Sequence, residues 1–131
     1  METSRLTAIP LLADLDDADL AIVAAAAREV DVANGDTLVI QGEFGHALFA
    51  IESGTADVSA DGEAIGKLGP GDVFGEIAVI ASGRRTATVV ATSPMRLIAL
   101  FKRDVWDLER RSPATAERLR ALVTERRQDR V

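Results

Sequence analysis

The residues that could perform chemistry gather in one short segment, FGEIAVIASGRRTATV at positions 74–89. Gly75 has no Cβ, so backbone or ligand can approach it closely. A single helical turn after it would leave backbone N–H groups without intrahelical partners, and such groups attract an anion. Arg85 offers a planar guanidinium that can hold a phosphate through two parallel hydrogen bonds. Thr86 adds a hydroxyl, and Glu76 adds a carboxylate that can accept from sugar hydroxyls.

Taken alone, each of these residues has an ordinary structural explanation. The segment FGEIAVI could be part of the core, and the arginine pair could lie in a solvated loop. Their combination resembles the phosphate-binding cassette of the cyclic-nucleotide-binding domain family, Phe-Gly-Glu-aliphatic-Ala-aliphatic followed by Arg-Thr-Ala-Thr-Val. The earlier stretch LVIQGEFGHALFAIESG resembles the family's second signature, with Gly42, Glu43, Gly45 and Gly54 at the expected places. The resemblance covers nearly the whole chain, and the sequence looks particularly like the domains attached to bacterial cyclic-nucleotide-gated potassium channels.

The resemblance implies a role for each residue around the phosphate and ribose. Glu76 is expected to accept from the ribose 2′-hydroxyl, and Arg85 to pair with the cyclic phosphate. Gly75, Ile77 and Ala78 are expected to supply backbone N–H groups. The implied ligand is cAMP or cGMP, with no metal.

The resemblance also implies how the base is held. Val58 and Val73 are expected to line the base, and Arg126 on the last helix to cover it. Thr86 stands where the family carries Ala, Ser or Thr, and a threonine there is associated with tolerance of cGMP. The preference between cAMP and cGMP stays open.

Three further residues are expected to have ordinary structural roles. Arg84 is expected to be a solvated charge whose field helps the site. His46 lies in a glycine-rich turn at the surface, and Trp106 is expected to pack within a helix.

The elements that must position this site are many short strands between helices. Asp16 is a good N-cap for a helix over the following residues. From residue 30 turn signals recur between short apolar runs, which is typical of a sandwich or barrel, and Asn34-Gly35 and Asp61-Gly62 predict tight hairpins. Ser112-Pro113 predicts the start of the last helix. Its inward stripe is Ala116, Leu119, Val123 and Arg126.

The predicted fold class is mainly β with flanking helices. We expect an eight-stranded jelly-roll-like β-roll, N-terminal helices, a short phosphate-binding helix and two C-terminal helices. The whole chain, 1–131, is expected to form one domain. Its expected parts are 1–29 for the N-terminal helices, 30–101 for the roll and 102–131 for the C-terminal helices.

The composition restricts the classes of function. The chain has 131 residues, of which 47% are hydrophobic, and this suits one packed domain. A net charge of −6 disfavours direct nucleic-acid binding, which needs a basic face. With no cysteine and a single histidine, no metal site is expected. Because the sequence has no signal peptide and no stretch of about 18 apolar residues, we expect no membrane segment and a cytoplasmic location.

The function expected from these features is that of a regulatory ligand-sensing domain and not an enzyme, because no nucleophile–base pair is present. Binding would close the C-terminal helix over the base and act on an effector domain or partner protein. The chain is expected to be monomeric. The alternative is a dimeric catabolite-activator-type transcription regulator that lacks or has lost its DNA-binding part. A roll that is only an interaction scaffold is disfavoured by the complete cassette. Whether the chain is a whole protein or an excised domain stays open.

Overall fold

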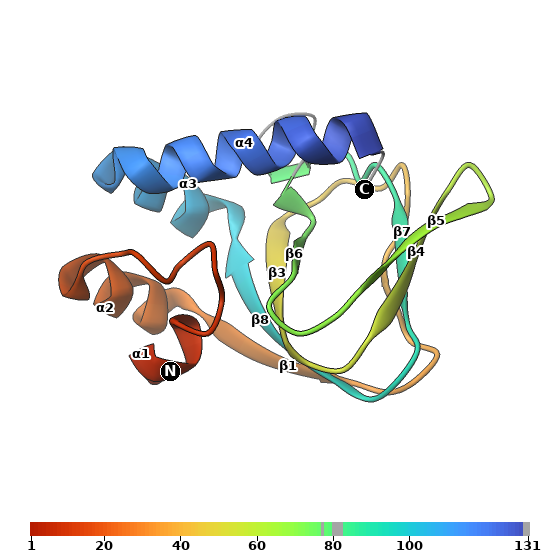
Figure 1. The fold of residues 1–131 in the computed structure, drawn as a ribbon, viewed down its shortest axis with the longest axis horizontal. Coiled ribbons are helices and arrows are strands. Elements are labelled where there is room, and N and C mark those ends of the chain that lie inside the picture. The colour runs from red at the N-terminus through yellow and green to blue at the C-terminus, as the bar shows by residue number, and fades with distance from the viewer. Residues whose placement is uncertain (77, 80–82, 130–131) are drawn as a thin grey trace.

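The computed structural model of the chain describes residues 1–76, 78–79 and 83–129, and it leaves out the side chains of residues 122, 123 and 125–129. The described residues form eight strands in two four-stranded antiparallel sheets, which face each other as the walls of a roll (Figure 1). The predicted mainly β, jelly-roll-like fold class is confirmed. The strands are β1 (Arg28–Val32), β2 (Thr37–Val39), β3 (Ala47–Ser53), β4 (Ala56–Ala60), β5 (Glu63–Leu68), β6 (Val73–Phe74), β7 (Thr88–Ala91) and β8 (Met95–Phe101).

In both sheets, most strands that lie side by side come from distant parts of the chain. The strand order is β1-β8-β3-β6 in one sheet and β2-β7-β4-β5 in the other. The hairpin predicted at Asn34-Gly35 is therefore wrong, because β1 pairs with β8 and β2 pairs with β7. Gly35 does form a turn, with a φ of 92°, but this turn leads the chain from one sheet to the other. Turn residues signal a change of direction, whereas the choice of strand partner is made by long-range packing.

The hairpin predicted at Asp61-Gly62 is confirmed. Strands β4 and β5 pair across it, and both turn residues have positive φ, 54° for Asp61 and 80° for Gly62. Two consecutive residues with positive φ are the requirement of a type I′ hairpin turn. Gln41 fastens the turn, since its amide donates to the Asp61 carboxylate at 2.9 Å and accepts from the Asp61 N–H at 2.8 Å.

Four helices flank the roll in the described part of the chain. They are α1 (Thr3–Leu6), α2 (Asp17–Ala26), α3 (Lys102–Arg111) and α4 (Pro113–Asp129). Both predicted caps are confirmed. The Asp16 carboxylate accepts from the Asp19 N–H at 2.8 Å, and the Ser112 hydroxyl accepts from the Thr115 N–H at 3.4 Å. Each cap satisfies one of the N–H groups that a helix start leaves unpaired.

Two hydrophobic clusters hold these layers together. One lies between the β1-β8-β3-β6 sheet and the helices and contains Ile98, while the other lies between the two sheets and contains Leu97. These neighbours on β8 enter different clusters because successive strand residues point to opposite faces. The sheet that carries β8 is therefore buried on both faces, with the helices on one side and the second sheet on the other.

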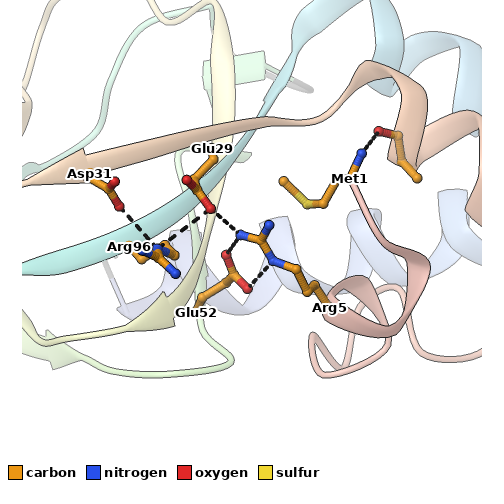
Figure 2. A network of polar contacts seen from close by, with 7 residues as sticks. Met1, Arg5, Glu29, Asp31, Glu52 and Arg96 are labelled. Atoms are coloured by element: carbon orange, nitrogen blue, oxygen red, sulfur yellow. Dashed lines mark hydrogen bonds and ion pairs between the residues drawn. The ribbon is translucent and has the colours of Figure 1, made fainter.

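Charged residues fasten α1 to the outside of the roll (Figure 2). Arg5 donates to the carboxylates of Glu52 on β3 and Glu29 on β1, the latter at 2.6 Å. Arg96 on β8 donates to Asp31 at 3.2 Å and also faces Glu29. The hydrogen bonds that Arg5 donates, first to Glu52 and then to Glu29, raise the pKa of Arg5. The network joins the N-terminal segment to three neighbouring strands.

Candidate functional site

The candidate site is a pocket between the two sheets. Both sheets contribute apolar side chains, and the connection between β6 and β7 contributes the polar groups. The lining residues are Val39, Val58, Leu68, Phe74, Gly75, Ala78, Arg85, Thr86, Ala87 and Val89. The structure thus brings together five of the residues singled out from the sequence: Gly75, Ala78, Arg85, Thr86 and Val58.

Arg85 is the cationic group of this pocket and is only 8% exposed. Its two terminal nitrogens donate to backbone carbonyls, to Gly75 at 3.0 Å and to Ala47 at 2.8 Å. Burial lowers the pKa of the guanidinium, and the negative charge of Glu76 opposes that shift. Because the ordinary pKa of an arginine lies far above neutral pH, the group stays charged at neutral pH. The pocket therefore contains a fixed positive charge, which two backbone carbonyls hold in place.

Gly75 is required by the geometry on one side of this arginine. It has a φ of 85°, which side chains rarely tolerate, and a Cβ there would collide with the terminal nitrogen of Arg85. The adjacent Glu76 is 0% exposed, and its charge acts directly on Arg85. A buried carboxylate needs compensation for lost solvation, and a nearby guanidinium supplies part of it.

Several predicted site residues lie elsewhere or cannot be placed. Val73, expected beside the base, is buried in the cluster beneath the helices and is absent from the pocket lining within the described part of the chain. Phe74 lines the pocket instead, because the two residues of β6 point to opposite faces of the sheet. Ile77 and the side chain of Arg126 lie outside the described residues, as does part of the expected phosphate-binding helix.

Backbone hydrogen bonds join the β2–β3 loop to the segment that carries Arg85. The N–H of Gly42 donates to the carbonyl of Arg85 at 2.8 Å, the N–H of Arg85 to Glu43 at 2.7 Å, and the N–H of Gly45 to Gly83 at 3.0 Å. These bonds form a short antiparallel ladder that continues the β2-β7 pairing. The second family signature is therefore brought directly against the first.

Arg84 has a more definite role than the solvated charge predicted for it. Its guanidinium donates to the carbonyl of Gly42 at 2.8 Å and lies 4.1 Å from the centre of the Phe44 ring. An exposed cation–π contact of this kind contributes about 0.5–1 kcal/mol. Arg84 thus holds the β2–β3 loop, while its neighbour Arg85 lines the pocket.

Two other residues connect the site to α3. His46 is exposed, as expected, and its carbonyl accepts from the N–H of Lys102 at the start of α3. The indole N–H of Trp106 donates to the carbonyl of Val79 at 3.3 Å, although the side chain is 48% exposed. Sequence reasoning missed this second contact, since nothing local to Trp106 signals a partner in the cassette.

The described residues thus place a buried arginine at a largely apolar pocket inside an eight-stranded roll, and this combination would suit a small anion with an apolar part. The chain belongs to the cyclic nucleotide-binding domain family, whose model matches residues 29–112. The family expected from the two sequence motifs is confirmed.

Individual relatives agree with this assignment. The chain is 35% identical over 97 residues to the cyclic AMP receptor protein of Thermus thermophilus, covering 70% of this chain and 45% of that protein. It is 34% identical over 122 residues to a cyclic nucleotide-gated potassium channel of Rhizobium etli, covering 93% of this chain and 34% of the channel. The chain thus spans less than half the length of these curated relatives.

Solved structures share the whole fold. A cAMP-bound PfPKA-R structure superposes with a TM-score of 0.89 at 25% identity, covering 98% of this chain and 45% of that one. The Thermus thermophilus catabolite activator protein gives 0.79 at 30% identity, covering 92% and 59%. Within the described residues, no helix is long and apolar enough to cross a membrane, and no cluster of three or more His, Cys, Asp or Glu is arranged to hold a metal ion.

Proposed function

We propose that this chain binds cAMP, and also cGMP, in the Arg85 pocket as a regulatory ligand-sensing domain. The observation that carries the proposal is the buried Arg85, which lines a largely apolar pocket between the two sheets. A cyclic phosphodiester keeps one negative charge. In a chain with a net charge of −6, such an anion needs a direct cationic partner.

In this proposal Arg85 pairs with the cyclic phosphate, and the N–H groups of Gly75, Ile77 and Ala78 complete the anion site. Glu76 accepts from the ribose 2′-hydroxyl. The proximity of Glu76 to Arg85 supports these two roles, because the phosphate and the ribose are joined in the ligand and must be bound by neighbouring groups.

The purine would lie in the apolar part of the same pocket. Val58 and Thr86 belong to its lining, and we replace the expected contact of Val73 with contacts from Leu68 and Phe74. The Thr86 hydroxyl is the group through which cGMP would be accepted. Arg126 is still proposed as the cover of the base, since the backbone of α4 runs over the roll toward its C-terminal end (Figure 1).

Calorimetric titration with cAMP and cGMP tests the proposal, after denaturation and extraction to remove any copurified ligand. We expect one site per chain, with cAMP bound as tightly as cGMP or more tightly. If neither nucleotide gives heat or a thermal shift at millimolar concentration, the proposal is wrong. Conversion of cAMP to AMP during incubation would show an enzyme, and we expect none.

The role of Glu76 predicts non-additive losses. Glu76→Gln should weaken cAMP binding by about tenfold, because a charge-assisted hydrogen bond to the ribose becomes a neutral one. The same substitution should change the affinity for 2′-deoxy-cAMP far less, since that ligand has already lost the hydroxyl. The measurement is a double cycle of two proteins and two ligands by calorimetry. Additive losses would mean that Glu76 does not contact the ribose.

We further propose that binding is coupled to the C-terminal helices through α3. The supporting observation is the hydrogen bond from the Trp106 indole to the carbonyl of Val79, the residue after the pocket residue Ala78. α3 packs against both α4 and α2, so a shift at Val79 has a route to the helical layer. A ligand that contacts both the pocket and the C-terminal helices would favour one arrangement of the helical layer.

This coupling predicts a fluorescence signal, because Trp106 is the single tryptophan of the chain. Saturating cAMP should shift the emission maximum or intensity of wild-type protein, with a midpoint that matches the calorimetric affinity. Arg85→Ala should require correspondingly more cAMP for the same change. Calorimetric binding without any change in emission would contradict a route through Trp106.

A further inference from the structure

We infer that Gly45 is a positioning residue for Arg85, and that the missing side chain at this position is what allows the guanidinium to reach the pocket. The inference rests on the proposed function, because the placement of Arg85 matters for affinity only if this arginine contacts the ligand. Gly45 lies on the β2–β3 loop and is itself buried.

The space around Gly45 is already filled by Arg85. A Cβ built on this residue would lie 2.9 Å from both Cζ and Nε of Arg85, and 2.5 Å from the Cβ of Ala78. Real Cβ atoms essentially never approach other heavy atoms this closely, so one of the neighbours would have to move. Gly45 and Gly75 thus border the guanidinium from two separate parts of the chain.

Arg85 has little freedom to move away. Both of its terminal nitrogens are held by backbone carbonyls, those of Gly75 and Ala47, and the side chain is 8% exposed. A displacement large enough to admit a methyl group would break at least one of these hydrogen bonds. The guanidinium would then leave the position at which the phosphate is proposed to bind.

Gly45 is equally unable to retreat. Its N–H donates to the carbonyl of Gly83 at 3.0 Å, and the loop is joined to the Arg85 segment by the neighbouring ladder bonds. Arg84 fastens the same loop from outside by its hydrogen bond to Gly42 and its contact with Phe44. With both sides fixed, the side chain at position 45 determines how close the guanidinium can lie.

Gly66 supplies a matched control. Neither Gly45 nor Gly66 has a left-handed φ, so an alanine at either position brings no backbone strain of that kind. At Gly66 no heavy atom lies within 4 Å of the added Cβ, whereas at Gly45 three lie within 2.9 Å. The two substitutions therefore differ mainly in the space available.

The first test measures cAMP affinity by calorimetry in Gly45→Ala and Gly66→Ala, with thermal unfolding of each protein without ligand. Gly45→Ala should fold cooperatively and bind cAMP about tenfold more weakly, and Gly66→Ala should change the affinity by less than about twofold. Unchanged affinity in Gly45→Ala, or loss of cooperative unfolding, would overturn the inference. A wild-type chain that binds no cyclic nucleotide would refute the proposed function, and this inference with it.

The second test separates positioning from a merely structural role. In an Arg85→Ala background, Gly45→Ala should lower the cAMP affinity by less than about twofold, because the arginine side chain that it would displace is absent. In an Ala78→Gly background, which removes the other close atom, the loss of about tenfold should persist. An equal loss with and without Arg85, or full recovery with Ala78→Gly, would show that Gly45 acts on the cassette backbone and not on the arginine.

Discussion

Replacing Arg85 with alanine is expected to weaken cAMP binding by about 30- to 1000-fold, or roughly 2–4 kcal/mol. The ligand charge would enter a pocket without its arginine, and it would lose the charged group that replaces its water. Calorimetric titration of wild type and variant measures the loss. Thermal unfolding without ligand shows whether the freed carbonyls of Ala47 and Gly75 also weaken the fold.

Arg84→Ala is the matched control for this prediction. Arg84 is exposed and contacts the loop, so its removal should cost less than about 1 kcal/mol in cAMP affinity. The adjacent positions make the pair a sensitive comparison, since both variants lose one positive charge from nearly the same place. A larger loss from Arg84→Ala than from Arg85→Ala would mean that the phosphate contact belongs to the other arginine.

Leu119→Ala is expected to lower the free energy of unfolding by about 2–5 kcal/mol. Leu119 is 1% exposed on α4 and belongs to the cluster between the helices and the β1-β8-β3-β6 sheet. Truncation removes buried methyl groups and leaves a cavity that the rigid sheet cannot close. Urea denaturation followed by circular dichroism measures the change.

Arg120→Ala serves as the control on the same helix, because this neighbouring side chain is exposed. It should change the free energy of unfolding by less than about 0.5 kcal/mol. If Leu119→Ala costs no more than Arg120→Ala, α4 is not anchored to the sheet through this residue. The proposed coupling between pocket and C-terminal helices would then lose its packing basis.

The fold could be predicted from sequence where its signals are local. Asp16 and Ser112 cap helices as predicted, and Asp61-Gly62 forms the predicted hairpin. Asn34-Gly35 has the same turn chemistry but joins two sheets. The difference lies in which strands the flanking residues pair with, and those partners, β8 and β7, come from the other half of the chain.

In the site, too, local sequence signals could be read in advance, whereas features that depend on long-range packing could not. A contiguous motif predicted Arg85 and Thr86, and the structure has both at the pocket. Val73 was expected beside the base, whereas Phe74 is the residue of β6 that lines the pocket. The face of a two-residue strand is known only once its register with Phe49 and Ala50 is known. The closeness of Gly45 to Arg85 could not be inferred either, since a glycine has no side chain whose chemistry would indicate its neighbour.

Both ends of the chain enter one hydrophobic layer, in which Leu6 from α1 packs in the same cluster as Leu108 and Leu119. An ion pair between Asp14 and Arg118 joins the two ends again at the surface. This layer is expected to move as one packed unit to which both ends of the chain are attached. A tilt of α4 cannot be absorbed by α4 alone, because its packing partners include the N-terminal residues. We therefore expect ligand binding in the pocket to change the signal of a reporter fused at the N-terminal end and also that of a reporter fused at the C-terminal end.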